Sequence, residues 1–361
     1  MRKHNFTAGP AALPLPVLEQ IKNDLPEWQN LGASVMELSH RGSDFEKVLN
    51  DCENNLRTLL NIPQDYAVLL MQGGALLQFS ILPMNLLSNR SADYVITGAW
   101  SQKAFLAAKK INEKVRIAAS TENSGFTTLP EGSAIQMNPH AAYLHLCTNE
   151  TIHGVEIAPE RIASVPMPIV CDMSSHILSR PLDMQQFGAI YAGAQKNIGP
   201  SGLTIVIIRR DLLGLAPLST PSVLDYAQVF ENHSMVNTPP TFAIYVANLV
   251  FEWLKEKGGL AAIEKENIAK AQKLYAVIDE SDGFYMNRVQ KDCRSRMNVP
   301  FFLSDENLNE KFLKESLKAD CLGLKGHQSV GGFRASLYNA TNLESVQVLC
   351  DFMQDFLKRN G

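Results

Sequence analysis

The sequence predicts an α/β protein, with a large domain on a mainly parallel seven-stranded sheet and a smaller α+β domain at the C-terminal end. Between residues 66 and 209, short β-rich segments alternate with helical or loop segments, which is typical of a parallel sheet covered on both faces. The pattern breaks into a loop-rich stretch between about 211 and 241. With 361 residues, the chain is long enough for two unequal domains. We expect a large domain over 15–257 and a small domain over 258–361, joined by the N-terminal segment 1–14.

Seven short apolar segments are the expected strands of the large sheet. In a mainly parallel sheet, ligands collect beyond the carboxyl ends of the strands, so the residues that follow each segment are candidates for a site. The segments are Tyr66–Met71, Asp93–Thr97, Val115–Ala118, Ala142–Cys147, Pro168–Asp172, Ala189–Ala192 and Leu203–Arg209.

The C-terminal part has the pattern of a separate α+β unit. A helix is expected over Phe242–Lys257, and the pair Gly258-Gly259 is a C-terminal stop signal for it. An amphipathic helix follows, with one apolar face. That face carries Ile263, Ile268, Ala271, Leu274 and Ile278, and the helix is followed by strands Met297–Leu303 and Gly331–Tyr338 and a final helix over Glu344–Lys358.

Composition excludes several classes of function. A formal net charge of -4 and a pI near 6.1 give no basic footprint for nucleic acid or an anionic membrane. No apolar segment approaches the length of a bilayer span, and the N-terminus has no apolar region typical of a signal peptide. The cysteines form no Cys-x-x-Cys pair, so we expect a cytoplasmic protein whose thiols are reduced and mostly buried. They are Cys52, Cys147, Cys171, Cys293, Cys321 and Cys350.

Lys196 is the first candidate for chemistry. It follows the expected strand Ala189–Ala192 and precedes the apolar run Leu203–Ile208, which places its amine in a restricted and partly dry position. Burial lowers the pKa of a lysine, and only the neutral amine condenses with an aldehyde. A single lysine in a loop is more often a surface residue, so the choice depends on its neighbours.

Two further features fit the same chemistry. The strand ending at Met71 runs into Gly73-Gly74-Ala75 and a helix start, where unpaired backbone N–H groups favour a phosphate, although a tight turn without a ligand has the same pattern. Asp172 ends an apolar strand, where it would serve a ligand or cap a helix. Pyridoxal phosphate requires a lysine, a carboxylate for its ring nitrogen and a helix start for its phosphate. Together these residues indicate that cofactor.

Trp100 and Thr151 follow two other expected strands. The Trp100 ring could stack on a flat heterocycle, although core packing is the more common use of a tryptophan. The Thr151 hydroxyl could bond a ring oxygen or cap a turn. Neither residue indicates a cofactor by itself.

Two segments place cationic donors among small residues. They are Ser39-His40-Arg41-Gly42 and the stretch from Gly326 to Ser336, which contains His327 and Arg334. Arginine binds carboxylates and phosphates through two parallel hydrogen bonds. Either segment alone would suit surface salt bridges, whereas the two together would suit a substrate with an anion at each end.

The motifs in their order along the chain resemble those of the phosphoserine aminotransferase family, from about Asn5 to the C-terminus. The matching motifs are Thr7-Ala-Gly9-Pro10-Ala, Val35-Met-Glu-Leu-Ser-His40-Arg41-Gly42, Asn149-Glu-Thr151-Ile, Ser179-Arg-Pro181, Tyr191-Ala-Gly-Ala-Gln195-Lys196-Asn197-Ile-Gly-Pro and Met235-Val-Asn237-Thr238-Pro-Pro-Thr. The resemblance implies a fold-type-I pyridoxal-phosphate enzyme of the class V aminotransferases. It also implies a homodimer with active sites at the subunit interface.

The resemblance assigns a role to each matching residue. Lys196 would link covalently to the cofactor aldehyde and act as general acid and base, and Asp172 would pair with the pyridinium nitrogen. Trp100 would stack on the ring and Thr151 would bond the phenolic oxygen. The resemblance implies that the cofactor phosphate is held by Ala75, Leu76 and Gln195, together with Asn237 and Thr238 of the other subunit. It implies that the distal phosphate or carboxylate of the substrate is bound by His40, Arg41 and His327. Arg334 would bind the substrate α-carboxylate.

The implied reaction is reversible transamination between L-glutamate and 3-phosphohydroxypyruvate, which gives O-phospho-L-serine and 2-oxoglutarate. The family also forms 4-phosphohydroxy-L-threonine in pyridoxine synthesis. Two positions depart from the pattern of some members, because Leu76 and Gln328 stand where those members have arginine. Leu76 can still donate its backbone N–H to the cofactor, but both changes remove positive charge near the expected substrate phosphate.

Three alternatives remain at this stage. One is another class V enzyme, such as an alanine–glyoxylate aminotransferase. A cysteine desulfurase would need a reactive cysteine on a mobile loop, for which Cys321 is the candidate nearest the substrate-binding tail. The third, from a different class, is a non-enzymatic anion-binding protein, which would have no need for Lys196 beside a strand.

Overall fold

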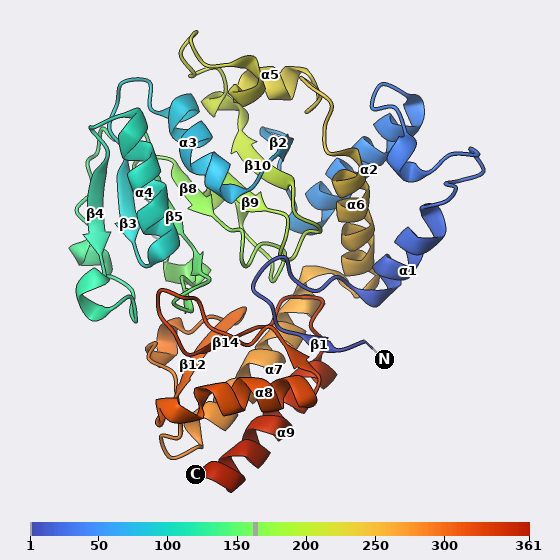
Figure 1. Ribbon diagram of the computed structural model, residues 1–361. Coiled ribbons are helices and arrows are strands. Elements are labelled where there is room, and N and C mark those ends of the chain that lie inside the picture. The colour runs from blue at the N-terminus through green and yellow to red at the C-terminus, as the bar shows by residue number, and fades with distance from the viewer. Residues whose placement is uncertain (1, 162–164) are drawn as a thin grey trace.

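The large part of the molecule is a seven-stranded sheet with helices on both faces (Figure 1). The computed structural model describes residues 2–161 and 165–361; Met1 of the expected N-terminal segment and residues 162–164 of the expected large domain lie outside the described residues. The sheet has the order β2-β10-β9-β8-β5-β3-β4. Its strands are β2 (Tyr66–Gln72), β3 (Asp93–Ile96), β4 (Arg116–Ser120), β5 (Leu144–Cys147), β8 (Ile169–Asp172), β9 (Ala189–Gly193) and β10 (Leu203–Arg209).

The mainly parallel sheet is confirmed, with one reversal. β10 pairs antiparallel with both β9 and β2, whereas the other neighbouring strands pair parallel. A parallel connection needs a crossover of a dozen or more residues, usually a helix. The link between β9 and β10, residues 194–202, is too short for one, so β10 turns back beside β9. This short link carries Gln195 and Lys196.

The alternation of side chains along β2 explains why both faces of the sheet are covered. Val68 and Leu70 point into one apolar cluster, and Ala67, Leu69 and Met71 point into another. The first cluster packs under α1 (Leu15–Asp24), α2 (Ser43–Leu60) and α6 (Thr241–Glu256), and the second under α3 (Ala75–Leu86), α4 (Ala99–Ile111) and α5 (Tyr226–Glu231).

The loop-rich stretch expected between about 211 and 241 contains the short helix α5. Asp225 caps it by accepting a hydrogen bond of 2.9 Å from the Ala227 N–H. Tyr226 and Val229 are buried against the sheet. Six residues give too little periodicity for recognition in sequence, and the burial of this helix depends on the tertiary fold.

The C-terminal part lies below the large sheet in Figure 1 and has its own core. Its three-stranded sheet has the order β11-β12-β14, and β1 near the N-terminus pairs parallel with β13. This pairing supports the grouping of the N-terminal segment with the small domain, while the boundary at 257/258 stays a prediction. The elements are α7 (Gly259–Asp279), β11 (Tyr285–Met286), β12 (Asn298–Leu303), α8 (Asn309–Lys318), β13 (Cys321–Leu322), β14 (Phe333–Ser336), α9 (Leu343–Asn360) and β1 (His4–Asn5).

The apolar face expected for α7 is only partly right. Four of its five members are buried, but Ile268 is partly exposed. Asn267 and Lys270 are buried instead, with 2% and 0% of their surface exposed. Polar groups at these positions are satisfied by main-chain and side-chain partners outside the helix, which periodicity cannot reveal.

A buried ion pair network ties the two parts together. Glu156, at the end of β7 (Val155–Glu156), lies 3.1 Å from Arg180 and 2.8 Å from Arg296, and Arg296 also reaches Glu264 on α7 at 3.0 Å. Burial alone would raise the pKa of Glu156, but Arg296 and Arg180 together lower it below its usual value. Breaking such a pair leaves an uncompensated buried charge. The network therefore holds the C-terminal part against the large sheet.

All six cysteines are free and buried, as the sequence indicated. Burial raises the pKa of the Cys321 thiol to about 11, so this thiol is not primed as a nucleophile. Among the described residues, none of the helices combines the length and the apolar character that a membrane crossing requires.

Candidate active site

A cavity of about 390 Å³ opens at the carboxyl ends of the central strands, between the large sheet and the C-terminal part. Its walls come from the β2–α3 turn, the N-terminus of α4, the ends of β5, β8 and β9, and the segment around β14. It brings together nine of the residues singled out in the sequence: Ala75, Leu76, Trp100, Thr151, Asp172, Gln195, Lys196, His327 and Arg334.

Lys196 lies just beyond β9, with its side chain partly exposed to this cavity. Its Nζ donates a hydrogen bond of 2.9 Å to Thr151 Oγ1 and lies 5.9 Å from the centre of the Trp100 ring. Burial lowers the pKa of Lys196, and the nearby Asp172 carboxylate opposes this shift. The amine is thus held at a fixed point on the cavity wall, and among residues 2–161 and 165–361 its Nζ has this one hydrogen-bond partner.

Asp172 ends β8 at the floor of the cavity. Its Oδ1 accepts hydrogen bonds from the Ser174 N–H at 2.9 Å and the Ser174 hydroxyl at 2.6 Å. These bonds close a turn, and no helix begins there, so the alternative of a helix cap does not apply. Burial raises the pKa of Asp172, while Lys196 and Ser174 oppose the shift. Ser174 also accepts from the Gly193 N–H at 3.0 Å, which ties β8 to β9.

Glu150 positions Trp100, a role that the sequence reasoning missed. Its carboxylate accepts hydrogen bonds from the Trp100 N–H at 3.0 Å and from the Ser101 N–H and hydroxyl at 2.8 and 2.6 Å, at the N-terminus of α4. A Cβ at Gly98 would lie 2.4 Å from the Glu150 side chain, so this position needs a glycine. The sequence offered two signals for this role: Glu150 is an acidic residue soon after an expected strand, and Gly98 is a glycine just before a helix.

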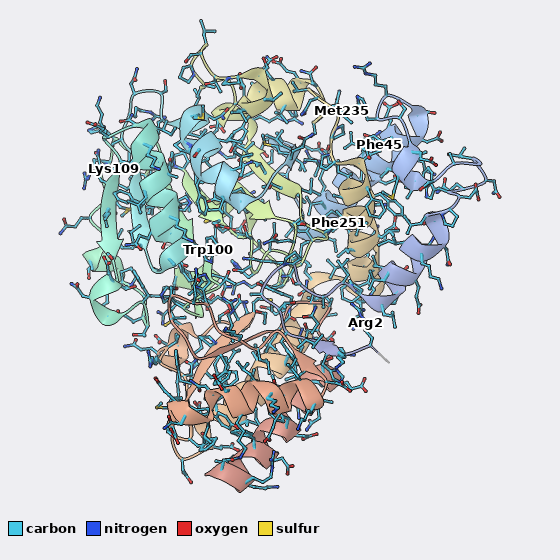
Figure 2. All side chains as sticks on the ribbon, viewed as in Figure 1. Arg2, Phe45, Trp100, Lys109, Met235 and Phe251 are labelled. Carbon is cyan, nitrogen blue, oxygen red and sulfur yellow. The ribbon has the colours of Figure 1, made fainter. Side chains whose placement is uncertain are left out.

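The Trp100 ring lines the cavity, and its Nε1 is buried without a hydrogen-bond partner in the part of the chain that the structure describes. An orphaned buried donor is costly unless a ligand supplies the acceptor. Trp100 is labelled in Figure 2, where it lies at the lower end of α4, next to the C-terminal part.

The β2–α3 turn has the geometry that the sequence predicts, a glycine turn that leads into a helix start, and its anion-binding role stays a prediction. Gly73 has a φ of 99°, which favours glycine, and α3 begins two residues later at Ala75. The first turn of α3 has no acidic residue, and Gly73, Gly74 and Ala75 all line the cavity. Unpaired N–H groups at a helix start bind phosphate.

Thr151 connects Lys196 to Arg334, and all three residues line the cavity. Its hydroxyl accepts from Lys196, and its carbonyl oxygen accepts a hydrogen bond of 3.1 Å from Arg334 Nη1 on β14. His327 Nδ1 lies 2.7 Å from the Ser329 hydroxyl. Burial lowers the pKa of His327, and the positive charges of Arg334 and Lys103 lower it further. Arg334 therefore supplies the positive charge on this part of the cavity wall.

Four predicted residues lie outside the cavity of their own chain. His40 is partly exposed, and Arg41, Asn237 and Thr238 are exposed. Asn237 borders a separate small hollow beside β2, and the carbonyl oxygen of Thr238 accepts a hydrogen bond from the Gln72 side chain. Their roles stay predictions.

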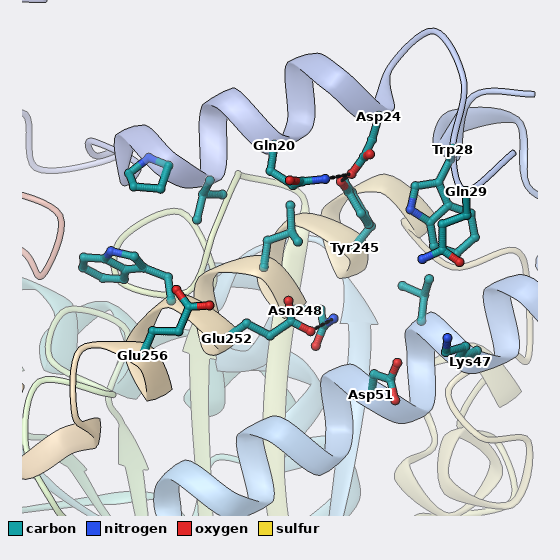
Figure 3. A pocket seen from close by; sticks show the side chains of 15 residues that line it. Gln20, Asp24, Trp28, Gln29, Lys47, Asp51, Tyr245, Asn248, Glu252 and Glu256 are labelled. Atoms are coloured by element: carbon teal, nitrogen blue, oxygen red, sulfur yellow. Dashed lines mark hydrogen bonds between the residues drawn. The ribbon is translucent and has the colours of Figure 1, made fainter.

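A second cavity of about 390 Å³ lies between α1, α2 and α6 (Figure 3). Gln20 donates a hydrogen bond of 2.9 Å to Asp24, and the Tyr245 hydroxyl donates to the same carboxylate. Its charged lining residues are Asp24, Lys47, Asp51, Glu252 and Glu256. Four of these five charged residues are acidic, so this negatively charged hollow does not suit a phosphorylated cofactor.

Comparison with known proteins decides the family. The family model described as Aminotransferase class-V matches residues 4–349. The chain belongs to the class V aminotransferases. Within this family, a protein from Aromatoleum aromaticum named phosphoserine aminotransferase is 56% identical over 365 residues, and the match covers 100% of both chains.

Solved structures give the same result. Phosphoserine aminotransferase from Bacillus circulans subsp. alkalophilus has a TM-score of 0.96 and 47% identity, over 100% of this chain and 99% of that one. Phosphoserine aminotransferase from Trichomonas vaginalis, solved with PLP bound, has a TM-score of 0.93 and 41% identity, over 98% of this chain and 100% of that one. The fold-type-I architecture expected for this class V aminotransferase is confirmed.

Proposed function

We propose that this class V aminotransferase is a pyridoxal-phosphate enzyme that transfers the amino group of L-glutamate to 3-phosphohydroxypyruvate. The products are O-phospho-L-serine and 2-oxoglutarate. The observation that carries the proposal is the single cavity that holds Lys196, Asp172, the start of α3 and Arg334. The full-length relatives named for this activity support the same reaction.

The residues of the cavity fit the cofactor. Its phosphate would be held by the backbone N–H groups of Ala75 and Leu76 and by the Gln195 side chain. The Trp100 ring would stack on the cofactor ring. The Trp100 Nε1 donor, which has no partner among the described residues, is free to bond a ligand. When bound, pyridoxal phosphate supplies an aldehyde that accepts the amino group and a ring that withdraws electrons.

Lys196 is the proposed point of covalent attachment and the residue that moves the proton. Its lowered pKa raises the fraction of neutral amine, and the bond to Thr151 fixes the position of Nζ. Asp172 would hold a proton on the ring nitrogen, because one of its oxygens is already fixed by Ser174 and the carboxylate faces the cavity. Thr151 would bond the phenolic oxygen.

Arg334 is the proposed ligand of the substrate α-carboxylate. It lies on a strand, it donates to the Thr151 carbonyl oxygen, and it lines the same cavity as Lys196. His327 faces the distal end of the substrate, and we propose that His40 and Arg41 add to that end. The substrate would then be held with its α-carbon near Lys196 Nζ.

The proposed enzyme is a homodimer in which Asn237 and Thr238 reach the active site of the partner. Both are exposed and lie outside the cavity of their own chain. Leu76, which lines the cavity, is 58% exposed in the single chain, and a partner subunit would cover this apolar side chain. Mixing Lys196→Ala subunits with subunits that carry Asn237→Ala and Thr238→Ala tests this. Mixed dimers should recover activity in one site of the two, whereas absence of recovery in isolated mixed dimers would contradict shared sites.

The substrate assignment is tested by half-reactions of the cofactor-loaded enzyme with O-phospho-L-serine, L-alanine and L-cysteine. We expect phosphoserine to react fastest. A faster reaction with alanine would favour an alanine–glyoxylate type of aminotransferase. We further propose that 4-phosphohydroxy-L-threonine is a second product, and that the enzyme works in the cytoplasm, where six free buried cysteines persist.

A further inference from the structure

Arg334 and Thr151 come from different parts of the molecule and meet at the cavity. Thr151 follows β6 (Asn149–Glu150) in the expected large domain, and Arg334 lies on β14 in the C-terminal part. Arg334 Nη1 donates to the Thr151 carbonyl oxygen at 3.1 Å, and the Thr151 hydroxyl accepts from Lys196. The proposed function, on which this inference rests, places the substrate α-carboxylate on Arg334 and its α-carbon near Lys196. The fit of a substrate therefore depends on how β14 is held against β6.

A buried asparagine, Asn298, joins β14 to β6. It lies on β12, opposite Ser336, which is two residues beyond Arg334 and so on the same face of β14. Its Nδ2 donates to the Ser336 hydroxyl at 3.0 Å, and its Oδ1 accepts from Asn149 Nδ2 at 2.9 Å. Asn149 is two residues before Thr151. Asn298 thus ties the two strands together beside both residues of the Arg334–Thr151 contact.

The side chains bonded to Asn298 and Asn149 complete a buried hydrogen-bond network. The Tyr338 hydroxyl accepts from Asn298 Nδ2 at 3.1 Å. Asn149 Oδ1 accepts from the Ser295 hydroxyl at 2.6 Å, and Asn149 Nδ2 also donates to the Ser175 hydroxyl at 2.7 Å. Each of these side chains has at most 2% of its surface exposed. An amide side chain has two donor hydrogens, so both asparagines use all of their donors here.

Close packing holds the same two segments against each other. The Ser295 N–H donates to the Gly154 carbonyl oxygen at 2.8 Å, in the turn between β6 and β7. Gly154 has a φ of 74°, and a Cβ there would lie 2.3 Å from Pro300 Cδ, on β12 opposite Arg334. A shift of β14 relative to β6 would leave buried amide groups of the network unpaired, which is costly. The network therefore selects one position of Arg334.

We propose that Asn298 is a positioning residue for the substrate α-carboxylate, because it bonds β6 to β14 and so holds the Arg334 guanidinium at a fixed place relative to Lys196 Nζ. Asn298 is not among the described residues that line the cavity, so it acts through Arg334. L-Glutamate and O-phospho-L-serine both carry an α-carboxylate, and the effect is therefore the same for both amino acids.

The test measures half-reactions of the cofactor-loaded enzyme with both amino acids, in wild type and Asn298→Ala. We expect the half-saturating concentration to rise about 10-fold for each. The maximal rate should stay within about threefold, because Arg334 binds the carboxylate equally before and during the reaction. Ser336→Ala keeps Asn298 and removes one acceptor, so it should give a smaller rise in a variant that is less disturbed. A rise for only one amino acid would contradict the proposal.

A double-mutant cycle with Arg334→Ala tests whether Asn298 acts through the arginine. In the Arg334→Ala background, Asn298→Ala should change kcat/KM by less than about twofold, because the group that it positions is already absent. Losses that multiply would mean that Asn298 acts independently of Arg334, and would overturn the inference. If Arg334→Ala itself leaves kcat/KM intact, the proposed function fails at that residue instead.

Asn267→Ala is the matched control. Asn267, on α7, is also a buried asparagine, and its Nδ2 donates to the Ser179 carbonyl oxygen and to Asn339 Oδ1, both at 3.0 Å. It too bonds the C-terminal part to the large one, but it is not among the described residues that line the cavity. It should leave both half-saturating concentrations unchanged. An equal rise in Asn267→Ala, or no rise in folded Asn298→Ala, would overturn the inference.

Discussion

The molecule has a lysine with a lowered pKa in each of its two parts, and the two lysines differ in what surrounds the amine. Lys270, on α7, is fully buried, and its Nζ donates to the carbonyl oxygens of Leu337, Tyr338 and Thr341 at 3.1, 2.9 and 2.8 Å. The Nζ of Lys196, beyond β9, makes one hydrogen bond to the part of the chain that the structure describes, and it faces a cavity.

Burial lowers the pKa of both lysines, so a lowered pKa does not distinguish a reactive amine from a structural one. An ammonium group has three donors, and those of Lys270 are all used to fix the chain after β14. Lys196 keeps unused capacity next to Asp172 and a helix start. The comparison indicates that the amine we propose as reactive differs from the structural one in its unused hydrogen-bonding capacity beside a cavity.

The largest expected effect is that of Lys196→Ala. Without the amine there is no covalent attachment and no proton transfer at the α-carbon, so we expect transamination to fall by at least about 10⁴-fold. The visible absorption band of the lysine-bound cofactor should disappear. Substantial transamination activity in this variant would show that Lys196 is not the residue that carries the reaction.

Asp172→Asn comes next. An amide cannot hold a proton on the ring nitrogen, so we expect kcat to fall about 10²- to 10³-fold, in line with the loss of one well-placed electrostatic contact. The variant should still bind the cofactor, as measured by absorption and by titration of the apoprotein. A kcat within threefold of wild type would remove Asp172 from the reaction.

Lys270→Met should act on stability. Three buried carbonyl oxygens would lose their donors, and we expect the free energy of unfolding to fall by about 2–4 kcal/mol in denaturant titrations. The folded variant should keep the cofactor band and a kcat near that of wild type. Loss of the cofactor absorption band in a fully folded Lys270→Met variant would show that Lys270 also supports the active site, so that the roles of the two lysines are not separate.

The pH dependence of stability sharpens the same contrast. Burial lowers the pKa of Lys270 to about 7 from its usual value of 10.5, so the unfolded chain binds more protons between these pH values. Its contribution to the free energy of unfolding therefore rises with pH from about 7 to 10.5. Denaturant titrations at several pH values should show a smaller rise in Lys270→Met than in wild type, and equal slopes would contradict this assignment.

The smallest effect is expected in the second cavity. Glu252, which lines it, accepts a hydrogen bond of 3.0 Å from Asn248 on the same helix. Glu252→Gln keeps the shape of this side chain, and we expect transamination to stay within about twofold of wild type, as for most surface changes. A large loss, measured in the same half-reactions, would mean that the acidic hollow takes part in the function.

The sequence could predict the strands because their apolar runs are local signals. Each of the seven expected strands of the large sheet appears within two residues of its predicted ends. It also indicated Lys196, Asp172 and the Gly73-Gly74 turn, because strand ends and helix starts are visible in the pattern. The reversal of β10 was not predicted, since it depends on which strands pair.

What the sequence could not show are contacts between distant segments. Glu150 caps α4 across 49 residues, and Lys270 bonds carbonyl oxygens 67 to 71 residues away. The positions of His40 and Arg41 outside the cavity likewise depend on tertiary structure. No periodicity encodes these partners, because each is chosen by the packing of the whole fold.

The most direct test of the central claim is to locate the covalent attachment of the cofactor. The loaded enzyme is reduced with borohydride, digested, and its peptides are examined by mass spectrometry. We predict the reduced pyridoxyl group on the peptide that contains Lys196, and unmodified peptides around Lys270 and Lys103. The group on any other lysine, with Lys196 unmodified, would contradict the account.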